Sequence, residues 1–346
     1  MKSLILKQDG LAAERPESVV LTDMTPFVDY TDHAEPEPDE GEVKIKVSLA
    51  SVNPSDEMFI QGLYGQRRVQ GTPAGFEGVG EVVASGGGPV ADGIKGLRVA
   101  FVAVPGKPGS WGEYAIASAA TCIPLIPEVR DEDGAAMIVN PLTALAMFDI
   151  VREAHDTDGA EKAFVITAGA SQLCKLMIAV AKDEGFRPIA IVRRDSQIEM
   201  LKQAGATHVL NCESDGFAAD MQAVMKAEKP RIFLDAVANG ISSAIFTAMP
   251  RKARWIIYGK LDDEMPVLQE PGQMIFMMKQ IEGFWLTRWM TEKPMADKMK
   301  AIQTAQKRFA SGEWQTDVTA IIPLEDAIAR VPEELAKPNG KVFIKP

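Results

Sequence analysis

A run of mostly small residues follows the apolar segment AFVIT and precedes an amphipathic one: Ala168, Gly169, Ala170, Ser171 and Gln172. At a strand-to-helix turn, small side chains let the backbone approach a ligand, and the amides and dipole of the helix attract a pyrophosphate. Ser171 can also cap the helix. A complete glycine fingerprint has further glycines, whereas this chain has Gln172 and Cys174. The position of the run predicts a dinucleotide site at residues 168–172.

Two arginines follow the next apolar segment, 24 residues after Gly169, in the sequence Ile191-Val192-Arg193-Arg194-Asp195. Sites for NAD usually have a carboxylate here for the ribose 2′-hydroxyl, whereas a guanidinium binds a 2′-phosphate through charge-assisted hydrogen bonds. Arg193 and Arg194 therefore favour NADP(H). Asp195 leaves NAD(H) as an alternative, and the arginines can also be read as solvated residues at a strand end.

Cysteine and histidine are scarce in this chain, with three of each. Cys122, Cys174 and Cys212 include no C-x-x-C pair, so they build neither a disulfide framework nor a cysteine-rich zinc lobe. His33, His155 and His208 lie outside ligand-like spacing. Few cysteines are typical of a reducing compartment.

Charge and hydropathy exclude several classes of protein. The 346 residues include 37 basic and 48 acidic side chains, a net charge of -11 with a pI near 5.0, which argues against nucleic-acid or anionic-membrane binding by the whole chain. The sequence has no run of about 18 apolar residues that could span a membrane. The apolar run in the first segment, MKSLILKQDG, is too short for a signal peptide. We therefore expect a cytoplasmic protein.

Two kinds of element must position these residues. Val43, Ile45, Val47 and Leu49 alternate with polar residues, which predicts a half-buried antiparallel strand, and residues 80–84, 97–104 and 113–116 are further strand candidates. Together they predict a β-rich module. The acidic segment DHAEPEPDEGE is expected to be a solvated loop.

From about Glu128 the sequence alternates between apolar strands and amphipathic helices, which predicts βαβ units with a parallel sheet covered by helices on both faces. Leu173, Leu176, Met177 and Val180 form the buried stripe of the first helix. The alternation stops beyond Pro266, and the remaining helix and the strand KVFIKP are expected to return to the first module. The predicted fold class is α/β, a doubly wound Rossmann sheet inserted in a β-rich domain.

Three segments of the first module carry a family resemblance: VNPSD at 52–56, QGLYG at 61–65 and PAGFEGVG at 73–80. They closely resemble the signature of the medium-chain dehydrogenase/reductase superfamily. NPLTA at 140–144 looks like the helix that enters its nucleotide domain, and EGFWL at 282–286 resembles a segment of its 2-enoyl thioester reductases, with quinone reductases as the neighbouring branch.

The resemblance implies a GroES-like catalytic domain at residues 1–126, a Rossmann NADP(H)-binding domain at 127–267, a C-terminal return at 268–346, and a homodimer. Zinc alcohol dehydrogenases of the superfamily have a cysteine near position 52 and a histidine before the glutamate. This chain has Val52 and Phe76-Glu77 at those places, so it resembles the metal-free branch.

A reductase without zinc is expected to act on an activated C=C bond conjugated to a carbonyl, or on a quinone, and the enolate that forms needs a hydrogen-bond donor. The resemblance assigns this work to Tyr64, and a phenol stays protonated at neutral pH. Asn53 is expected to position Tyr64 or the substrate carbonyl. Tyr64 read as a turn residue, and Asn53 read as a cap, are the structural alternatives.

Further candidates complete the expected site. Thr143, by analogy, and Tyr258, after the strand RWII, are assigned to the cofactor, and Phe284 and Trp285 to an apolar substrate pocket or the core. Arg67 and Arg68 are expected to bind phosphates of a coenzyme A substrate, or to be solvated loop residues. The leading hypothesis is an NADPH-dependent 2-enoyl thioester reductase. A quinone reductase and a non-catalytic NADPH sensor are the alternatives.

Overall fold

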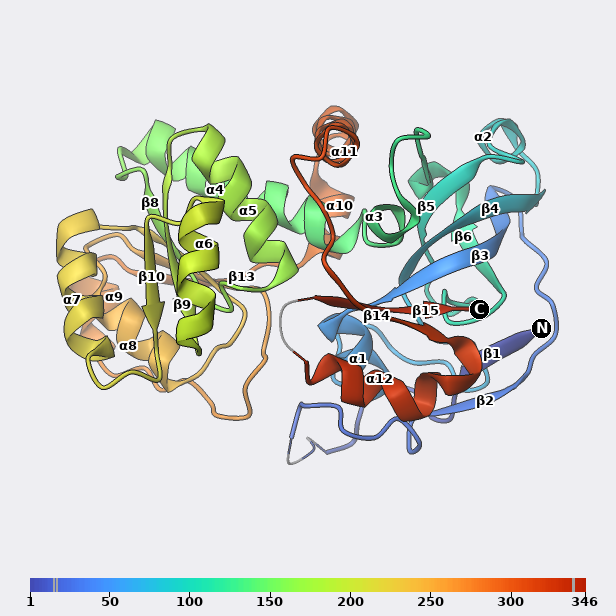
Figure 1. Cartoon of the computed structure of the whole chain (residues 1–346), viewed down its shortest axis with the longest axis horizontal. Helices are drawn as coiled ribbons and strands as arrows, with labels where there is room; N and C mark the ends of the chain where they lie inside the picture. Colours follow the sequence, from blue (N-terminus) through green and yellow to red (C-terminus); the bar gives the residue numbers. More distant parts are fainter. Residues whose placement is uncertain (15, 17, 338–339) are drawn as a thin grey trace. The chain divides into compact units, whose positions relative to one another are not determined.

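The computed structural model describes residues 1–14, 16, 18–337 and 340–346 (Figure 1). The chain forms two compact units, the first made of Met1–Asn140 and Ile302–Pro346, the second of Pro141–Ala301. Within the described ranges, none of the helices combines the length and the apolar character that crossing a membrane requires.

The first unit is built on a seven-stranded sheet of order β14-β15-β3-β4-β5-β7, with β6 paired to β3. Its strands are β3 (Glu42–Val52), β4 (Glu77–Ser85), β5 (Arg98–Val102), β6 (Tyr114–Ser118), β7 (Ile123–Pro124), β14 (Val318–Pro323) and β15 (Lys341–Lys345). A separate pair, β1 (Lys2–Leu6) and β2 (Val28–Asp32), is antiparallel. Short helices accompany them: α1 (Pro54–Ile60), α2 (Pro89–Gly93), α3 (Asp131–Ala135) and α12 (Ala327–Leu335). The predicted β-rich module with a returning tail is confirmed.

The alternation in β3 has the predicted buried face, with one departure on the other face. Val43 and Ile45 are fully buried, but Lys44 is also buried, and its ammonium lies 2.8 Å from a carboxylate oxygen of Glu35. Glu35 and Glu37, both from the acidic segment, supply the partners that let this lysine leave water. The segment is therefore not only a solvated loop.

The second unit contains a six-stranded parallel sheet of order β10-β9-β8-β11-β12-β13. The strands are β8 (Ala163–Ile166), β9 (Arg187–Val192), β10 (His208–Asn211), β11 (Ile232–Asp235), β12 (Arg254–Ile257) and β13 (Gln280–Gly283). The helices that lie wholly within this unit are α5 (Gln172–Asp183), α6 (Ile198–Ala204), α7 (Phe217–Glu228), α8 (Gly240–Ala248), α9 (Gly272–Phe276) and α10 (Leu286–Glu292). The boundaries between the units fall inside two further helices, α4 (Val139–Asp158) and α11 (Met295–Ala310).

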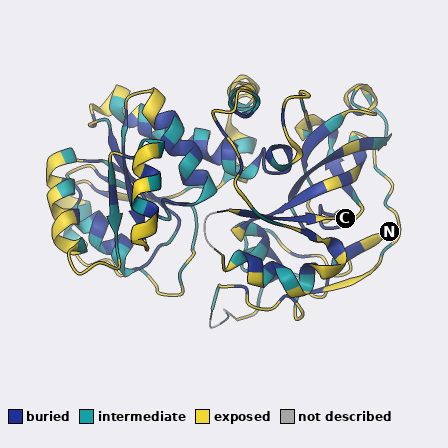
Figure 2. Ribbon diagram, viewed as in Figure 1, coloured by how far each residue is buried: buried dark blue, intermediate teal, exposed yellow. Residues whose placement is uncertain are grey.

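Helices cover both faces of this sheet, α5 and α6 on one side and α7 and α8 on the other (Figure 1). The central strands are buried along their length (Figure 2), and all four residues of the predicted stripe on α5 are buried. The predicted doubly wound Rossmann sheet is confirmed.

The predicted domain boundaries differ from those of the two units. Residues 127–140 belong to the first unit, because Ala135 and Ala136 of the α3 segment pack in one cluster with Leu49, Val79 and Phe343. Residues 268–301 belong to the second unit, because β13 extends its sheet by parallel pairing with β12. The C-terminal return therefore begins at residue 302 and not at residue 268.

Candidate functional site

The turn after β8 brings the chain back against the neighbouring strand. Ala168 has a positive φ of 50°, and the Gly169 amide donates to the carbonyl oxygen of Ile191 at 3.0 Å. A Cβ atom at position 169 would lie 2.8 Å from the Cβ of Ala190, closer than side chains tolerate. Gly169 is thus required by its contact with β9, and the turn has the tightness that a pyrophosphate-binding turn needs.

The helix that follows the turn is capped by its own first residues. The Ser171 side chain accepts a hydrogen bond from the Cys174 amide at 3.3 Å, as the sequence predicted for a cap. Gln172 is the first residue of α5 and is half-buried. The N-terminus of α5 therefore supplies the helix dipole and amides that suit a phosphate group.

Cys174 occupies the place of the last fingerprint glycine without opening the turn. Its thiol is fully buried, donates to the Thr167 carbonyl oxygen at 3.4 Å and lies 3.6 Å from the Tyr258 hydroxyl. Cys174 is thus packed in the interior, and this burial raises the pKa of its thiol. The same contact places Tyr258 beside the turn.

Asp235 is a buried carboxylate that the sequence analysis did not single out. It accepts hydrogen bonds from the Thr167 hydroxyl at 2.5 Å, the Trp255 indole at 2.8 Å and the Val237 amide at 2.9 Å. These bonds join β8, β11 and β12 near the edge where the dinucleotide turn lies. The aspartate after the apolar run RIFL was the available signal, because a charge at the end of a buried strand needs partners.

The arginines after β9 are exposed, whereas the acidic residue beside them has a partner. Arg193 and Arg194 are both exposed to solvent. The Asp195 carboxylate accepts a hydrogen bond from the Asn211 side chain at 2.8 Å. The exposed cations at this strand end therefore suit a 2′-phosphate better than Asp195 suits a 2′-hydroxyl.

Tyr64 lies in the first unit, on the turn that follows α1. Gly62 at this turn has a φ of 76°, and a Cβ there would lie 2.6 Å from the backbone of Ala12, so the turn requires glycine. The half-buried Tyr64 ring packs on Phe76 with 5.2 Å between centroids, and Phe59 of α1 packs on Phe76 at 4.8 Å. The Phe76 ring, itself packed on Phe59, thus holds the phenol on a constrained turn.

Asn53 is part of a buried polar network. Its side-chain amide donates to the Glu77 carboxylate at 2.9 Å and to the Ser51 hydroxyl at 3.0 Å, and its carbonyl oxygen accepts from the Lys341 ammonium. The other Glu77 oxygen accepts from the amides of Ile138 and Val139 at the start of α4. Glu77 therefore serves as a hydrogen-bond acceptor for two side chains and two backbone amides.

The described residues contain no cluster of side chains suited to a metal ion. No group of three or more histidine, cysteine, aspartate or glutamate side chains there is arranged to hold an ion. The residue before Glu77 is Phe76, whose ring packs against Phe59 and Tyr64.

The two neighbouring arginines of the first unit have opposite environments. Arg68 is 4 % exposed, and its guanidinium donates to the carbonyl oxygens of Gly10 and Ile60 and to the Gln8 side chain. Arg67 is exposed. The expectation that Arg68 binds a substrate phosphate does not fit this position, because its donors tie the loop to the protein.

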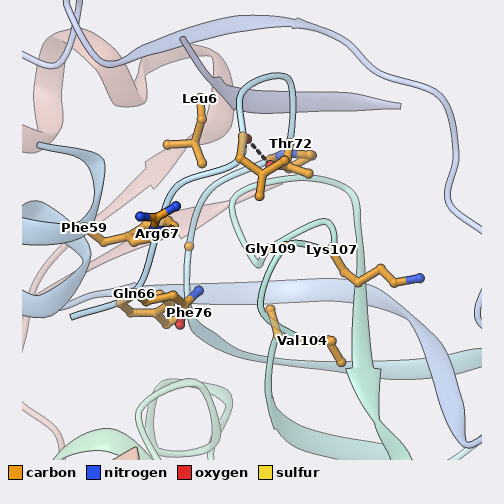
Figure 3. Close-up of a pocket in the computed structure, with 14 residues that line it drawn as sticks. Leu6, Phe59, Gln66, Arg67, Thr72, Phe76, Val104, Lys107 and Gly109 are labelled. Atoms are coloured by element: carbon orange, nitrogen blue, oxygen red, sulfur yellow. Dashed lines mark hydrogen bonds between the residues drawn. The ribbon is translucent and has the colours of Figure 1, made fainter. Parts of the chain in front are cut away.

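Arg67 lines a small pocket of the first unit, together with Phe59, Phe76, Gln66 and Lys107 (Figure 3). Its volume of about 20 Å³ has no room for a ring or an acyl chain. The pocket is therefore a hollow beside Arg67 that is too small to be a substrate site by itself.

The remaining candidates all lie outside this first-unit pocket. Thr143 is buried on α4. Phe284 is half-buried and Trp285 is 40 % exposed, directly after β13. The exposure of Trp285 argues against the alternative that this residue fills the core.

Together, the GroES-like arrangement of strands and the Rossmann sheet with its glycine turn define a two-unit nicotinamide-dependent oxidoreductase fold. Residues 39–128 match the alcohol dehydrogenase GroES-like domain, and residues 173–301 match the zinc-binding dehydrogenase family. A solved structure from Mesorhizobium loti, provisionally assigned as an NADPH:quinone reductase, is 58 % identical, with a TM-score of 0.95 over 100 % of this chain and 98 % of that chain. The chain belongs to the medium-chain dehydrogenase/reductase superfamily.

More distant relatives carry two different activities. The mitochondrial enoyl-[acyl-carrier-protein] reductase of Bos taurus is 26 % identical over 291 residues, 82 % of this chain and 75 % of that protein. The quinone oxidoreductase of Thermus thermophilus, solved with NADPH, is 22 % identical, with a TM-score of 0.76 over 100 % of both chains. The likeness to the Thermus thermophilus structure supports the two-unit fold of this chain.

Proposed function

We propose that the protein is an NADPH-dependent reductase of the C=C bond in α,β-unsaturated carbonyl compounds, with a 2-enoyl thioester as the acceptor. The observation that carries the proposal is Tyr64, a phenol held on a constrained turn by Phe76. The curated relatives that match 82 % of the chain and are named as enoyl reductases support the choice of acceptor.

The second unit has residues that fit an NADPH molecule. The turn 168–172 and the α5 N-terminus suit the pyrophosphate, and exposed Arg193 and Arg194 suit the 2′-phosphate. We assign Thr143 and Tyr258 to the same cofactor. The relative from Mesorhizobium loti, provisionally assigned to NADPH, supports this choice.

NADPH, when bound, would supply a hydride for the β carbon of the acceptor. In the proposed mechanism the Tyr64 hydroxyl donates a hydrogen bond to the carbonyl oxygen, where negative charge develops, and then gives its proton to the α carbon, after which the phenolate takes up a proton from water. Asn53, which donates to Glu77, lies at the start of α1, the helix that leads to the turn of Tyr64. No metal takes part in this proposal, since aromatic Phe76 stands before Glu77 and the Glu77 oxygens are taken by hydrogen bonds.

We assign Phe284 and Trp285 to the apolar part of the acceptor and Arg67 to the phosphates of a coenzyme A thioester. The exposure of Arg67 and Trp285 supports these assignments. A net charge of -11 makes a local cation such as Arg67 necessary for an anionic acceptor.

A quinone reductase is the second candidate, and the 58 % identical structure with that provisional assignment favours it. A quinone needs no cation for phosphates. The two candidates therefore differ in whether Arg67 and Tyr64 matter to turnover.

The test follows NADPH absorbance with crotonyl-CoA, a small enone and a quinone in turn, for the native chain and for Tyr64→Phe. We expect crotonyl-CoA turnover, with kcat lowered about 100-fold by Tyr64→Phe because the donor is lost. Tyr114→Phe, a half-buried tyrosine of β6, is the matched control and should leave kcat unchanged. Turnover of quinone alone, insensitive to Tyr64→Phe, establishes the second candidate. NADPH binding without any turnover indicates a sensor.

We also propose that the protein is a homodimer that pairs through the β13 side of the second unit. β13 is the edge strand of its sheet, and Ile281 on it is 43 % exposed. Ile275 and Phe276 of the nearby α9 are 73 % and 76 % exposed. Exposed apolar residues beside an unpaired strand edge are the usual mark of an association surface.

A further inference from the structure

Lys341 of β15 has a buried ammonium group inside the first unit. The residue is 6 % exposed, and its Nζ donates to the Asn53 side-chain oxygen and to the Val52 carbonyl oxygen, the latter at 3.3 Å. Burial lowers the pKa of Lys341, and the negative charges of Glu77, Asp56 and Glu57 oppose that change. Its electrostatic partners are thus three carboxylates.

These carboxylates are themselves removed from water. Asp56 is fully buried and Glu77 is 1 % exposed, while Glu57 is half-buried. An isolated buried carboxylate is costly, and its cost falls when a cation and hydrogen-bond donors surround it. Burial raises the pKa of Asp56 and of Glu57 to about 7, and the charge of Lys341 opposes that rise. Removal of Lys341 therefore leaves Glu77 without its cation and shifts Asp56 and Glu57 further toward the protonated form, which weakens the hydrogen bonds that the Asp56 carboxylate accepts.

Asp56 connects this charge cluster to the aromatic residues around Tyr64. One carboxylate oxygen accepts a hydrogen bond from the backbone amide of Asn53 at 2.9 Å, which fixes the start of α1. The other accepts from the Phe76 amide at 2.8 Å. Phe76 carries the ring on which Tyr64 packs, so the same carboxylate joins the helix before Tyr64 to the ring beneath it.

We propose that Lys341 is a positioning residue of the reductase, because its ammonium holds Asn53 and balances Asp56 and Glu77, and these in turn hold α1 and Phe76 in the arrangement that orients Tyr64. The inference rests on the role of Tyr64 in the proposed function. It assigns a residue more than 270 positions away in the chain to the alignment of the phenol.

The test is a double-mutant cycle of Lys341→Met and Tyr64→Phe, with kcat measured on the acceptor that the native protein turns over. In the native background, Lys341→Met should lower kcat about 10-fold or more, because small misalignment of a catalytic group is costly. The KM for NADPH should stay within about twofold. In the Tyr64→Phe background the same substitution should change kcat by less than about twofold, because the group that it aligns is gone. Lys345→Met, exposed on the same strand, is the matched control.

The outcomes separate this inference from the proposed function. Equal loss of kcat in both backgrounds, or no loss in either, overturns the positioning role alone. If Tyr64→Phe has no effect, the proposed role of Tyr64 fails and the inference fails with it. If Lys341→Met does not fold, the cycle is run with Lys341→Met/Glu57→Gln against Glu57→Gln, which removes one charge of each sign. Failure of that pair to fold assigns Lys341 to stability and also overturns the proposal.

Discussion

At the scale of single residues, Arg193 and Arg194 set the proposed preference for the phosphorylated cofactor. Because both are exposed at the end of β9, their replacement changes the charge without disturbing the core. We expect Arg193→Glu/Arg194→Glu to weaken NADPH binding about 100-fold, since two attractive contacts become repulsive, and to change NADH binding by less than about threefold. Fluorescence titration with each cofactor measures both constants.

Lys226→Glu on α7 is the control for that experiment, because it reverses an exposed charge on another element of the second unit. It should leave both binding constants unchanged. An equal loss of affinity for NADPH and NADH in the arginine variant contradicts the cofactor assignment.

Burial of individual polar residues was the part of the site that sequence reasoning could not resolve. Arg67 and Arg68 are adjacent and chemically identical, yet Arg67 is exposed and Arg68 is buried. Arg68 donates to two backbone carbonyl oxygens and to one side chain of the same unit. The difference depends on Gly10 and Gln8, about 60 residues away in the chain. The local sequence contains no signal for such a contact, whereas the small size of the residues in the dinucleotide turn is enough to predict the role of the turn.

At the scale of elements, the closeness of the dinucleotide turn to β9 leaves no room for a side chain at Gly169. Gly169→Ala places a methyl group 2.8 Å from the Cβ of Ala190, so the turn must move away from the strand. We expect a loss of about 1–3 kcal/mol in the free energy of unfolding and at least tenfold weaker NADPH binding. Urea denaturation and cofactor titration measure the two effects.

Gly216→Ala is the matched control, since its added methyl group would meet only the Asp220 side chain at 3.6 Å, an ordinary contact. It should change the free energy of unfolding by less than about 0.5 kcal/mol. If Gly169→Ala behaves like this control, the turn is not the constrained element described above.

The strongly periodic elements were predictable and the weakly periodic one was not. The apolar runs before Thr167 and Ala236 became β8 and β11, both buried in all residues. β13 has only one partly buried residue among four, so its sequence lacks the apolar signal of a buried strand. That absence explains why residues 268–301 were expected to belong to the first unit.

At the scale of the whole molecule, the proposed homodimer depends on the β13 edge. Ile281→Asp puts a charge on that edge, which disfavours strand pairing between subunits. We expect sedimentation equilibrium to show a dimer for the native protein and a monomer for the variant. Leu97→Asp, at a position in the first unit that is 42 % exposed, should remain dimeric. A native monomer at micromolar concentration would contradict the proposal.

The division into two modules and the return of the tail were predictable because the motifs and the strand-helix alternation occur in order along the chain. The position of the tail within the sheet was not predictable. β15 lies between β14 and β3, with Val342 opposite Val52. Pairing over such a distance in sequence depends on which edge remains open once the other strands have formed, and no local pattern records it.

This interior place of β15 has a consequence for biosynthesis. As the polypeptide leaves the ribosome, β3 emerges early and its partners β4 and β6 follow soon, but its third partner, β15, is made only after nearly 300 further residues have been added. Residues 141–301 have all the strands of their own sheet by then and can fold during translation. The last residues of β3, from Ala50 to Val52, must wait without this partner until residues 341–345 arrive, whereas its first half can already pair with β6.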